Sequence, residues 1–317
     1  MADGTVIAAA LLAEARGTAE RAAARSLAEI RPLESMPDLI TACALFDRVW
    51  GYQPGQASEM QPPLLRALEH SGSYLAGAYR DEEMVAASVA FFAVPLDSGG
   101  GGRPGRPGLH SHITGVLPGM AGSGIGAALK WHQRSWALER GIDLVTWTYD
   151  PLIARNSFFN VARLGAVPQE YLVEFYGLMD DQLNAGQPTD RALAVWELAS
   201  DTVVDRAVGR AAARSTADLT EAAAGVRLSV GRDGRPQQRD TDAATQLIGV
   251  PTDIEGLRRK DPDAALAWRL ALRETMAPLI ADPAWQVVDF LGSGSYVFAR
   301  NHSAHDDSAH ARTEGEA

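Results

Sequence analysis

The chain contains a single cysteine, Cys43, among its 317 residues. One cysteine rules out an internal disulfide framework and any cysteine-rich metal site, and it fits a reducing compartment. The sequence also lacks an apolar run of about 18 residues, the length needed to cross a membrane. Asp3 stands where a secretory signal would carry positive charge. We therefore expect a cytoplasmic protein with no membrane partner.

Positive charge is scarce too, because 29 Lys and Arg stand against 40 Asp and Glu and leave a formal net charge of −11. An acidic chain does not offer the basic surface that attracts nucleic acids, so we expect no nucleic-acid partner. Histidines scattered over residues 301–317 are typical of a solvated tail rather than a metal site, and no bound metal is expected. Hydrophobic residues make up 46% of the chain, which is enough for one large domain or two ordinary ones.

The spacing of apolar residues predicts a mixed α/β fold. The strand–helix–strand segment from His110 to Tyr149 should form a right-handed parallel crossover, whereas the first strands should pair as antiparallel neighbours. The expected strands cover residues 28–34, 74–79, 84–94, 109–117, 142–149, 170–176 and 193–198, and the expected helices cover 36–50, 63–71, 122–140 and 154–164.

Composition divides the chain into four parts. Residues 1–27 are Ala-rich and predict an amphipathic helical extension, with a frayed tail as the alternative. Residues 28–200 carry the predicted sheet, and residues 201–300 form a smaller α+β extension with a helix from Asp261 to about Ala281. Residues 301–317 should be disordered, and the Gly-rich segment at 97–108 should be an exposed loop. Four apolar residues of the extension helix are available for burial: Leu266, Leu270, Leu272 and Met276.

The stretch V-L-P-G-M-A-G-S-G-I-G-A-A-L, Val116 to Leu129, places glycines at the entrance of a predicted helix. Its spacing does not match the dinucleotide fingerprint G-x-G-x-x-G, and it lacks the G-K-[ST] that ends a P-loop. A helix N-terminus nevertheless offers unpaired N–H groups and partial positive charge. Glycines let a phosphate approach that backbone closely, so we interpret the amides of residues 121–126 as a pyrophosphate cradle.

The pattern V-x-P-x-x-x-G-x-G-I-G-x-x-L resembles the acyl-CoA-binding motif of the GNAT acyltransferase superfamily. The segment R-N-S-F-F-N-V-A-R-L-G-A, Arg155 to Ala166, resembles the next motif of that family. A subgroup of predicted GNAT proteins is similar at Leu183 to Leu198 and over the C-terminal stretch from G-V-P-T-D to V-V-D-F. The GNAT resemblance covers about residues 28–200.

The resemblance implies a GNAT fold, with a mixed central sheet covered by helices on both faces. It also implies N-acyl transfer from acetyl-CoA or another acyl-CoA to the amine of a small molecule such as an amino acid, by direct attack in a ternary complex. Val116 and Leu117 would pair with the pantetheine arm where two parallel strands splay apart, and Asn156 would lie near the thiol. The implied cofactor-binding residues are Val116, Leu117, Ala121, Gly122, Ser123, Gly124, Ile125, Gly126 and Asn156.

Two positions depart from the family pattern. Ala121 stands where Gln or Arg is usual, and Val161 stands where many members carry a Tyr that protonates the leaving thiolate. The two departures keep an alternative open, namely a catalytically weak or inactive CoA-binding protein with a regulatory or assembly role. A homodimer is a candidate assembly.

Amine attack needs a base to remove a proton. Strand alternation places His110, His112 and Thr114 on one face and Ser111 and Ile113 on the other. His112 is our candidate base, with a structural, hydrogen-bonded histidine as the alternative, and His110 is a weaker, substrate-side candidate.

Tyr149 and Tyr176 are candidate acids in place of the missing Tyr, although Tyr149 also suits a core position. Asp150, at the carboxyl end of its strand, could bind the amine or cap the helix near Asn156. Arg191 could hold a substrate carboxylate, or it could form a local turn with Asp190.

Overall fold

The computed structural model describes residues 8–52, 58–94, 105–177, 187–210 and 224–301. Most of the Gly-rich loop at 97–108 and nearly all of the C-terminal tail lie outside these ranges. The chain divides into two compact units, Met1–Trp147 with Trp196–Arg210 and Thr148–Val195 with Ala211–Ala317. Two of the three boundaries between the units fall inside strands, and the third follows residue 210. The division into residues 1–27, 28–200, 201–300 and 301–317 stays a prediction.

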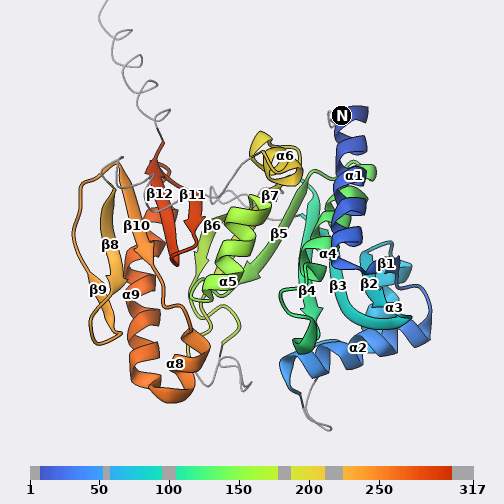
Figure 1. Ribbon diagram of the computed structural model, residues 1–317, viewed down its shortest axis with the longest axis horizontal. Helices are drawn as coiled ribbons and strands as arrows, with labels where there is room; N and C mark the ends of the chain where they lie inside the picture. The colour runs from blue at the N-terminus through green and yellow to red at the C-terminus, as the bar shows by residue number, and fades with distance from the viewer. Residues whose placement is uncertain (1–7, 53–57, 95–104, 178–186, 211–223, 302–317) are drawn as a thin grey trace, which may run out of the picture. The chain divides into compact units, whose positions relative to one another are not determined.

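A mixed sheet forms the centre of the first unit. Its neighbours β1 to β4 pair antiparallel in chain order, and β4 pairs parallel with β5. This confirms both the mixed α/β class and the expected parallel crossover. The strands are β1 (Glu29–Pro32), β2 (Tyr74–Arg80), β3 (Glu83–Ala93), β4 (Gly108–Val116) and β5 (Leu144–Tyr149) (Figure 1).

Helices cover both faces of this sheet. On one face, α2 (Met36–Trp50) and α3 (Pro62–His70) enclose a core that includes Phe46, Val89 and Ile113. On the other, α4 (Ile125–Glu139) carries α1 (Ala9–Ser26), and the buried Arg134 of α4 forms an ion pair with Glu14 at 2.7 Å. The N-terminal extension is therefore a packed helix over its described length. A short helix, α6 (Asp201–Val208), completes the unit.

Local sequence signals explain where α2 begins and ends. The Ser35 hydroxyl accepts a hydrogen bond from the Asp38 amide at 3.2 Å and caps the N-terminus. Gly51 ends the helix in the left-handed region, at φ 75°, which costs a glycine little.

A β-bulge in β4 corrects the expected alternation of side chains. Val89 pairs with Ile113 and Ala90 with Ser111, so His112 is the extra residue. Ser111 faces α4, where it accepts a hydrogen bond from Lys130, whereas Ile113 lies in the α2 core. Thr114 pairs with the Ser88 hydroxyl at 2.8 Å, on the opposite face from Ile113. The prediction of one face for His110, His112 and Thr114 is therefore wrong for Thr114.

The second unit contains a five-stranded sheet in the order β11-β12-β10-β8-β9. Its strands are β8 (Gly225–Val230), β9 (Pro236–Gln238), β10 (Thr245–Gly249), β11 (Trp285–Leu291) and β12 (Ser295–Arg300), with helices α8 (Ile254–Lys260) and α9 (Pro262–Ala281). The unit also holds α5 (Ala154–Ser157), which continues as a π-helix at Phe158–Leu164, and β6 (Val167–Leu172). Strand β6 pairs antiparallel with β7 (Arg191–Glu197). Figure 1 labels most of these elements.

The structure corrects several expectations in this unit. Strand β6 begins at Val167, ahead of the expected 170, and sequence patterns did not indicate β9 or α8. In α9, Leu272 and Met276 are buried as expected, but Leu266 and Leu270 are exposed. The buried stripe instead follows Ala265, Trp268, Leu272, Met276 and Leu279, at helical spacing. Within the described ranges, no helix is both long and apolar enough to span a bilayer.

Candidate functional site

The glycine-rich segment forms a tight connection between β4 and α4. Pro118–Met120 make one 3₁₀ turn, and α4 begins only at Ile125, three residues after the expected start. The delay has a backbone cause, because Gly122 (φ +80°) and Gly124 (φ +85°) adopt left-handed conformations. Gly124 is the N-cap and supplies no side-chain cap, so the helix entrance is left open.

The cradle of free amides is shorter than expected. The Ala121 amide donates to the Pro118 carbonyl and the Ser123 amide to the Met120 carbonyl, each at 3.3 Å. These two expected phosphate donors are therefore used within the loop itself.

The free donors come from the first turn of α4. The first internal bond of the helix runs from the Ala128 amide to the Gly124 carbonyl at 3.0 Å. The amides of Ile125, Gly126 and Ala127 therefore have no acceptor inside the helix. A Cβ added at Gly122 would have no heavy atom within 4 Å, so the loop is open beside these donors. Free amides, an open surface and the positive helix end fit a pyrophosphate group.

The end of β4 presents backbone groups away from β3. The Leu117 amide donates to the Val85 carbonyl at 3.0 Å, so Leu117 is not a free donor as expected. Successive residues of an antiparallel strand point their N–H and C=O groups alternately towards the partner strand and away from it. Those of Val116, next to Leu117, therefore point away from β3. On the side of β4 that faces away from β3, the residues paired with β5 are Leu109 and His110. Val116 lies beyond them and is suited to pair with an extended chain such as pantetheine.

The bulge residue His112 lies beside His110 on the α2 side of the sheet. Both rings contact Phe91, with centroid distances of 5.9 Å for His112 and 5.4 Å for His110. Burial lowers the pKa of His112, against an opposing effect of the Glu59 carboxylate. Burial, with the charges of His112 and Lys130, lowers the pKa of His110 to about 4. Both imidazoles are thus neutral at pH 7. The Glu59 carboxylate nevertheless favours the protonated form of His112.

His110 is already engaged within the sheet. Its Nδ1 lies 3.2 Å from the Thr146 hydroxyl. This contact matches the structural alternative that we weighed for a strand histidine, and it leaves His112 as the stronger candidate base of the two.

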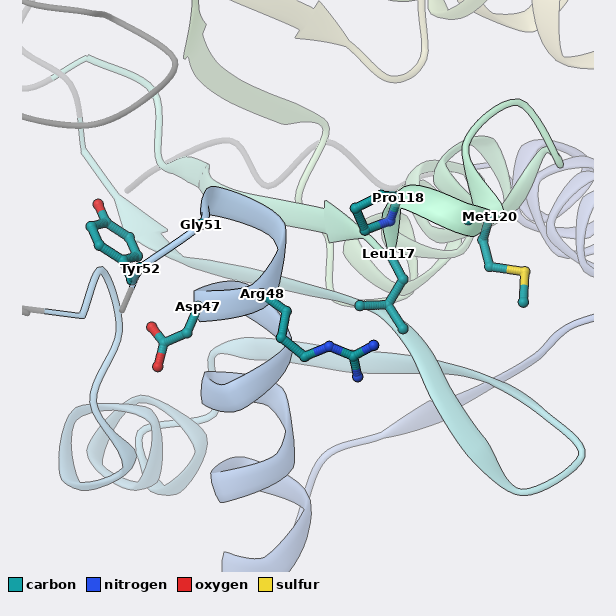
Figure 2. Close-up of a pocket in the computed structure, with 8 residues that line it drawn as sticks. Asp47, Arg48, Gly51, Tyr52, Leu117, Pro118 and Met120 are labelled. Atoms are coloured by element: carbon teal, nitrogen blue, oxygen red, sulfur yellow. The ribbon is translucent and has the colours of Figure 1, made fainter. Parts of the chain in front are cut away.

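A cavity of about 600 Å³ lies between the end of α2 and the start of the glycine-rich segment. The Tyr52 hydroxyl at this end of α2 donates to Glu59 at 3.0 Å, which links the cavity wall to the carboxylate that acts on His112. Sequence patterns did not single out the α2 side of this cavity, since Asp47 to Tyr52 are distant in sequence from the glycine-rich segment. The lining residues are Asp47, Arg48, Gly51, Tyr52, Leu117, Pro118, Gly119 and Met120 (Figure 2).

Lys130 is a second feature that sequence patterns missed. Its ammonium group is buried on the α4 side, donates to the Ser111 hydroxyl at 2.8 Å and to Gln133 at 3.2 Å, and lies over the Trp147 ring. Burial lowers its pKa to about 7. It faces away from Ile113 and the α2 core, and we assign it no catalytic step.

The remaining candidates lie in the second unit. The Tyr149 hydroxyl is buried, 3.2 Å from that of Tyr296, and burial raises its pKa. This environment matches the core position that we weighed as its alternative. Tyr176 is 42% exposed, and its hydroxyl lies 2.8 Å from that of Thr148 at the end of β5. Tyr176 is therefore the more accessible of the two candidate acids.

The Asp150 carboxylate lies between arginines of α8 and α9. Arg269 donates to both of its carboxylate oxygens, at 2.9 and 2.7 Å, and Arg258 donates to one of them. A further bond comes from the Leu152 amide at 3.0 Å. Burial opposes ionisation, but the two guanidinium groups outweigh it and hold the pKa below its usual range. Because these partners occupy both oxygens, Asp150 is the centre of a buried ion network and not a free amine binder.

Arg191 is also largely enclosed. Its guanidinium group donates to the Asp190 carbonyl at 3.0 Å, as in the local alternative, and packs over the Tyr176 ring at 5.3 Å. The Asp190 carboxylate pairs instead with Arg273, at 2.8 and 2.9 Å. Burial lowers the pKa of Arg191, against an opposing effect of the Asp150 carboxylate.

Asn156 and Val161 belong to the helical segment of the second unit. Asn156 lies in α5 and is half-buried, and no hydrogen bond of its side chain occurs within the described residues. Val161 is 2% exposed and packs in a core with Leu152 and Trp268. The position where the family carries a catalytic Tyr is therefore filled by a core side chain.

No protein-family model matches the chain, and no curated protein matches it. Among solved structures, it is similar to the ribosomal-protein-S18-alanine N-acetyltransferase from Escherichia coli, at 16% identity over 55% of this chain and 95% of that one, with a TM-score of 0.42. It is also similar to a protein from Desulfovibrio desulfuricans assigned to the GNAT family of acetyltransferases, at 16% identity over 54% of this chain and 99% of that one, with a TM-score of 0.38. A third similar structure is that of the NatC complex bound to Gag peptide and CoA. The identity is 11% over 54% of this chain and 98% of that one, and the TM-score is 0.40.

At these identities and TM-scores the similarity carries no argument about the function. We therefore base the function on this chain's own residues.

Proposed function

We propose that this protein is an acyl-CoA-dependent N-acyltransferase, most simply an acetyltransferase, acting on the amine of a small molecule. The observation that carries the proposal is the open helix entrance, where left-handed Gly122 and Gly124 precede the free amides of Ile125, Gly126 and Ala127. A helix entrance of this kind binds phosphate through its backbone, so the Ala at position 121 costs little.

The acyl-CoA would be held at two places on the first unit. The first-turn amides of α4 would bind the pyrophosphate, and the outward edge of Val116 would pair with the pantetheine amides. Bound there, the cosubstrate supplies an activated thioester carbonyl. The protein's own contribution is to align the acceptor amine and to manage the protons.

His112 is the proposed base. Its lowered pKa keeps the imidazole neutral and able to accept a proton from the amine near pH 7. Glu59 then stabilises the imidazolium that forms, by charge attraction. The bulge at His112 presents this ring on the α2 side of the sheet, where the cavity beside α2 also lies.

Tyr176 is the proposed proton donor to the thiolate, since Val161 cannot act and Tyr149 is enclosed in the core. The alternative function, a CoA-binding protein without turnover, is favoured by the burial of Val161. The two functions predict the same cofactor binding and differ in catalysis.

Two measurements on the full chain test the proposal. Isothermal titration with CoA and acetyl-CoA should show saturable binding, and free-thiol release should follow when amino acids are added as acceptors. Binding without thiol release for any amine would support the alternative function. The absence of binding for every CoA species would overturn both.

A further inference from the structure

The cavity beside α2 carries charges of both signs on adjacent residues. Figure 2 shows the Arg48 side chain extending towards Leu117, while the Asp47 carboxylate lies apart from it near Tyr52. Asp47 accepts a hydrogen bond from the Ser58 hydroxyl at 2.6 Å. Arg48 forms no ion pair within the described residues, although the chain carries an excess of acidic side chains. The Arg48 side chain, without an ion pair in the part of the chain that the structure describes, therefore lines this cavity as a positive charge.

The other walls suit a small organic molecule. Leu117, Pro118 and Met120 provide apolar contact area, and the volume of about 600 Å³ lies within the usual range for ligand pockets. Tyr52 connects the cavity to Glu59, whose charge acts on the candidate base His112. The cavity is thus placed to hold the part of an acceptor that does not react.

We propose that this cavity is the acceptor site and that Arg48 selects amines that also carry a carboxylate, such as amino acids. Arginine suits this task because its planar fork can bind both carboxylate oxygens. Asp47 and Glu59 add negative charge that favours the protonated amine on arrival. The inference rests on the proposed acyltransferase function and adds to it the chemical class of the acceptor.

The decisive experiment compares each proteinogenic amino acid with its α-carboxamide, which keeps the amine and removes the carboxylate charge. Thiol release with acetyl-CoA is measured for the wild type, R48Q, R48K and R239Q. Arg239 is an exposed arginine of the second unit, so R239Q controls for loss of one positive charge. Thermal melting of each variant controls for folding, which an exposed Arg48 should not affect.

We expect R48Q to raise KM for the preferred amino acid about ten- to hundred-fold, the range for a lost hydrogen bond to a charged group. KM for its carboxamide, KM for acetyl-CoA and kcat should change little. R48K should recover part of the loss because it keeps the charge without the fork. R239Q should match the wild type.

Two results would overturn the inference. If R48Q raises KM for acetyl-CoA instead, the anion at this site is a phosphate of the nucleotide. If R48Q affects amino acid and carboxamide equally, Arg48 does not recognise a carboxylate.

A wild type without turnover still allows a test. Titration of amino acids into the CoA-loaded protein should then show binding that R48Q weakens, and unchanged binding would refute the role of Arg48. Failure of the acyltransferase proposal itself looks different, because the wild type would then release no thiol with any amine, or would bind no CoA species at all.

Discussion

The ammonium group of Lys130 lies 3.9 Å from the centre of the Trp147 ring, and both side chains are buried. Its hydrogen-bond acceptors are the neutral groups of Ser111 and Gln133, and no carboxylate pairs with it within the described residues. A buried cation without a counter-ion is costly to keep charged. The relationship therefore links the stability of the first unit to pH.

Stability should rise with pH through the titration range of Lys130. Its pKa is about 7 in the folded protein against an ordinary value of 10.5, so between these values the unfolded chain binds more protons. The free energy of unfolding must then increase from pH 7 upwards. Urea unfolding at pH 7, 8 and 9 should show this slope in the wild type and a smaller slope in K130M. The exposed Lys260 provides the control K260M, and equal slopes in all three proteins would contradict the interpretation.

Replacing Gly122 should weaken CoA binding through backbone strain alone. A Cβ meets no heavy atom within 4 Å at either Gly122 or Gly119, but only Gly122 has a positive φ. A non-glycine residue in the left-handed region costs about 1–2 kcal/mol. We expect G122A to lower CoA affinity about ten-fold in isothermal titration and G119A to leave it unchanged. Equal losses in both variants would point to a steric cause instead.

Removal of the His112 imidazole should slow the chemical step. General base catalysis contributes about 10²–10⁴-fold, so H112N should lower kcat by that factor with little change in KM for acetyl-CoA. In the wild type, kcat/KM should fall only as pH drops below 6.5, because burial lowers the pKa of His112 from that value. The exposed His70 supplies the matched variant H70N. Retention of both the rate and the acid limb in H112N would exclude His112 as the base.

Loss of the Tyr176 hydroxyl should affect turnover without unfolding the protein. Y176F removes the contact with Thr148 at an exposed position, and we expect a reduction in kcat of about ten-fold or more. Y149F serves for comparison, since its buried hydroxyl contacts Tyr296 and its loss should mainly lower the melting temperature. If instead Y149F lowers kcat and Y176F mainly lowers the melting temperature, Tyr149 is the acid.

Asp150 should prove structural. D150N leaves the buried Arg258 and Arg269 without their shared carboxylate, and breaking a buried pair of this kind costs about 3–5 kcal/mol. Urea unfolding should show that loss, whereas D240N at an exposed carboxylate should not change stability. A stable D150N protein with a raised KM for the acceptor would restore the amine-binding interpretation.

The elements of the first unit were largely predictable because their signals are local. The Ser35 cap and the left-handed Gly51 set the two ends of α2 within a few residues of sequence. The expected strands at 74–79 and 84–94, joined by a short polar turn, likewise predicted an antiparallel hairpin. Predictions failed where a distant partner decides the outcome. Leu266 looked available for burial, but the sheet of the second unit packs on the side of α9 that carries Ala265 and Trp268.

The features of the candidate site also divide into those set by local sequence and those set by distant partners. Sequence alone determined that a glycine-rich connection follows β4, since positive φ angles at Gly122 and Gly124 are open to glycine at low cost. A local turn at Pro118 to Met120 uses the amides of Ala121 and Ser123, which the sequence patterns did not indicate. Only the tertiary structure decided that a bulge presents His112 on the α2 side, that two arginines from the distant helices α8 and α9 enclose Asp150, and that Arg48 faces a cavity. Backbone conformation depends on neighbouring residues, whereas burial, charge pairing and cavity lining depend on residues that only folding brings together.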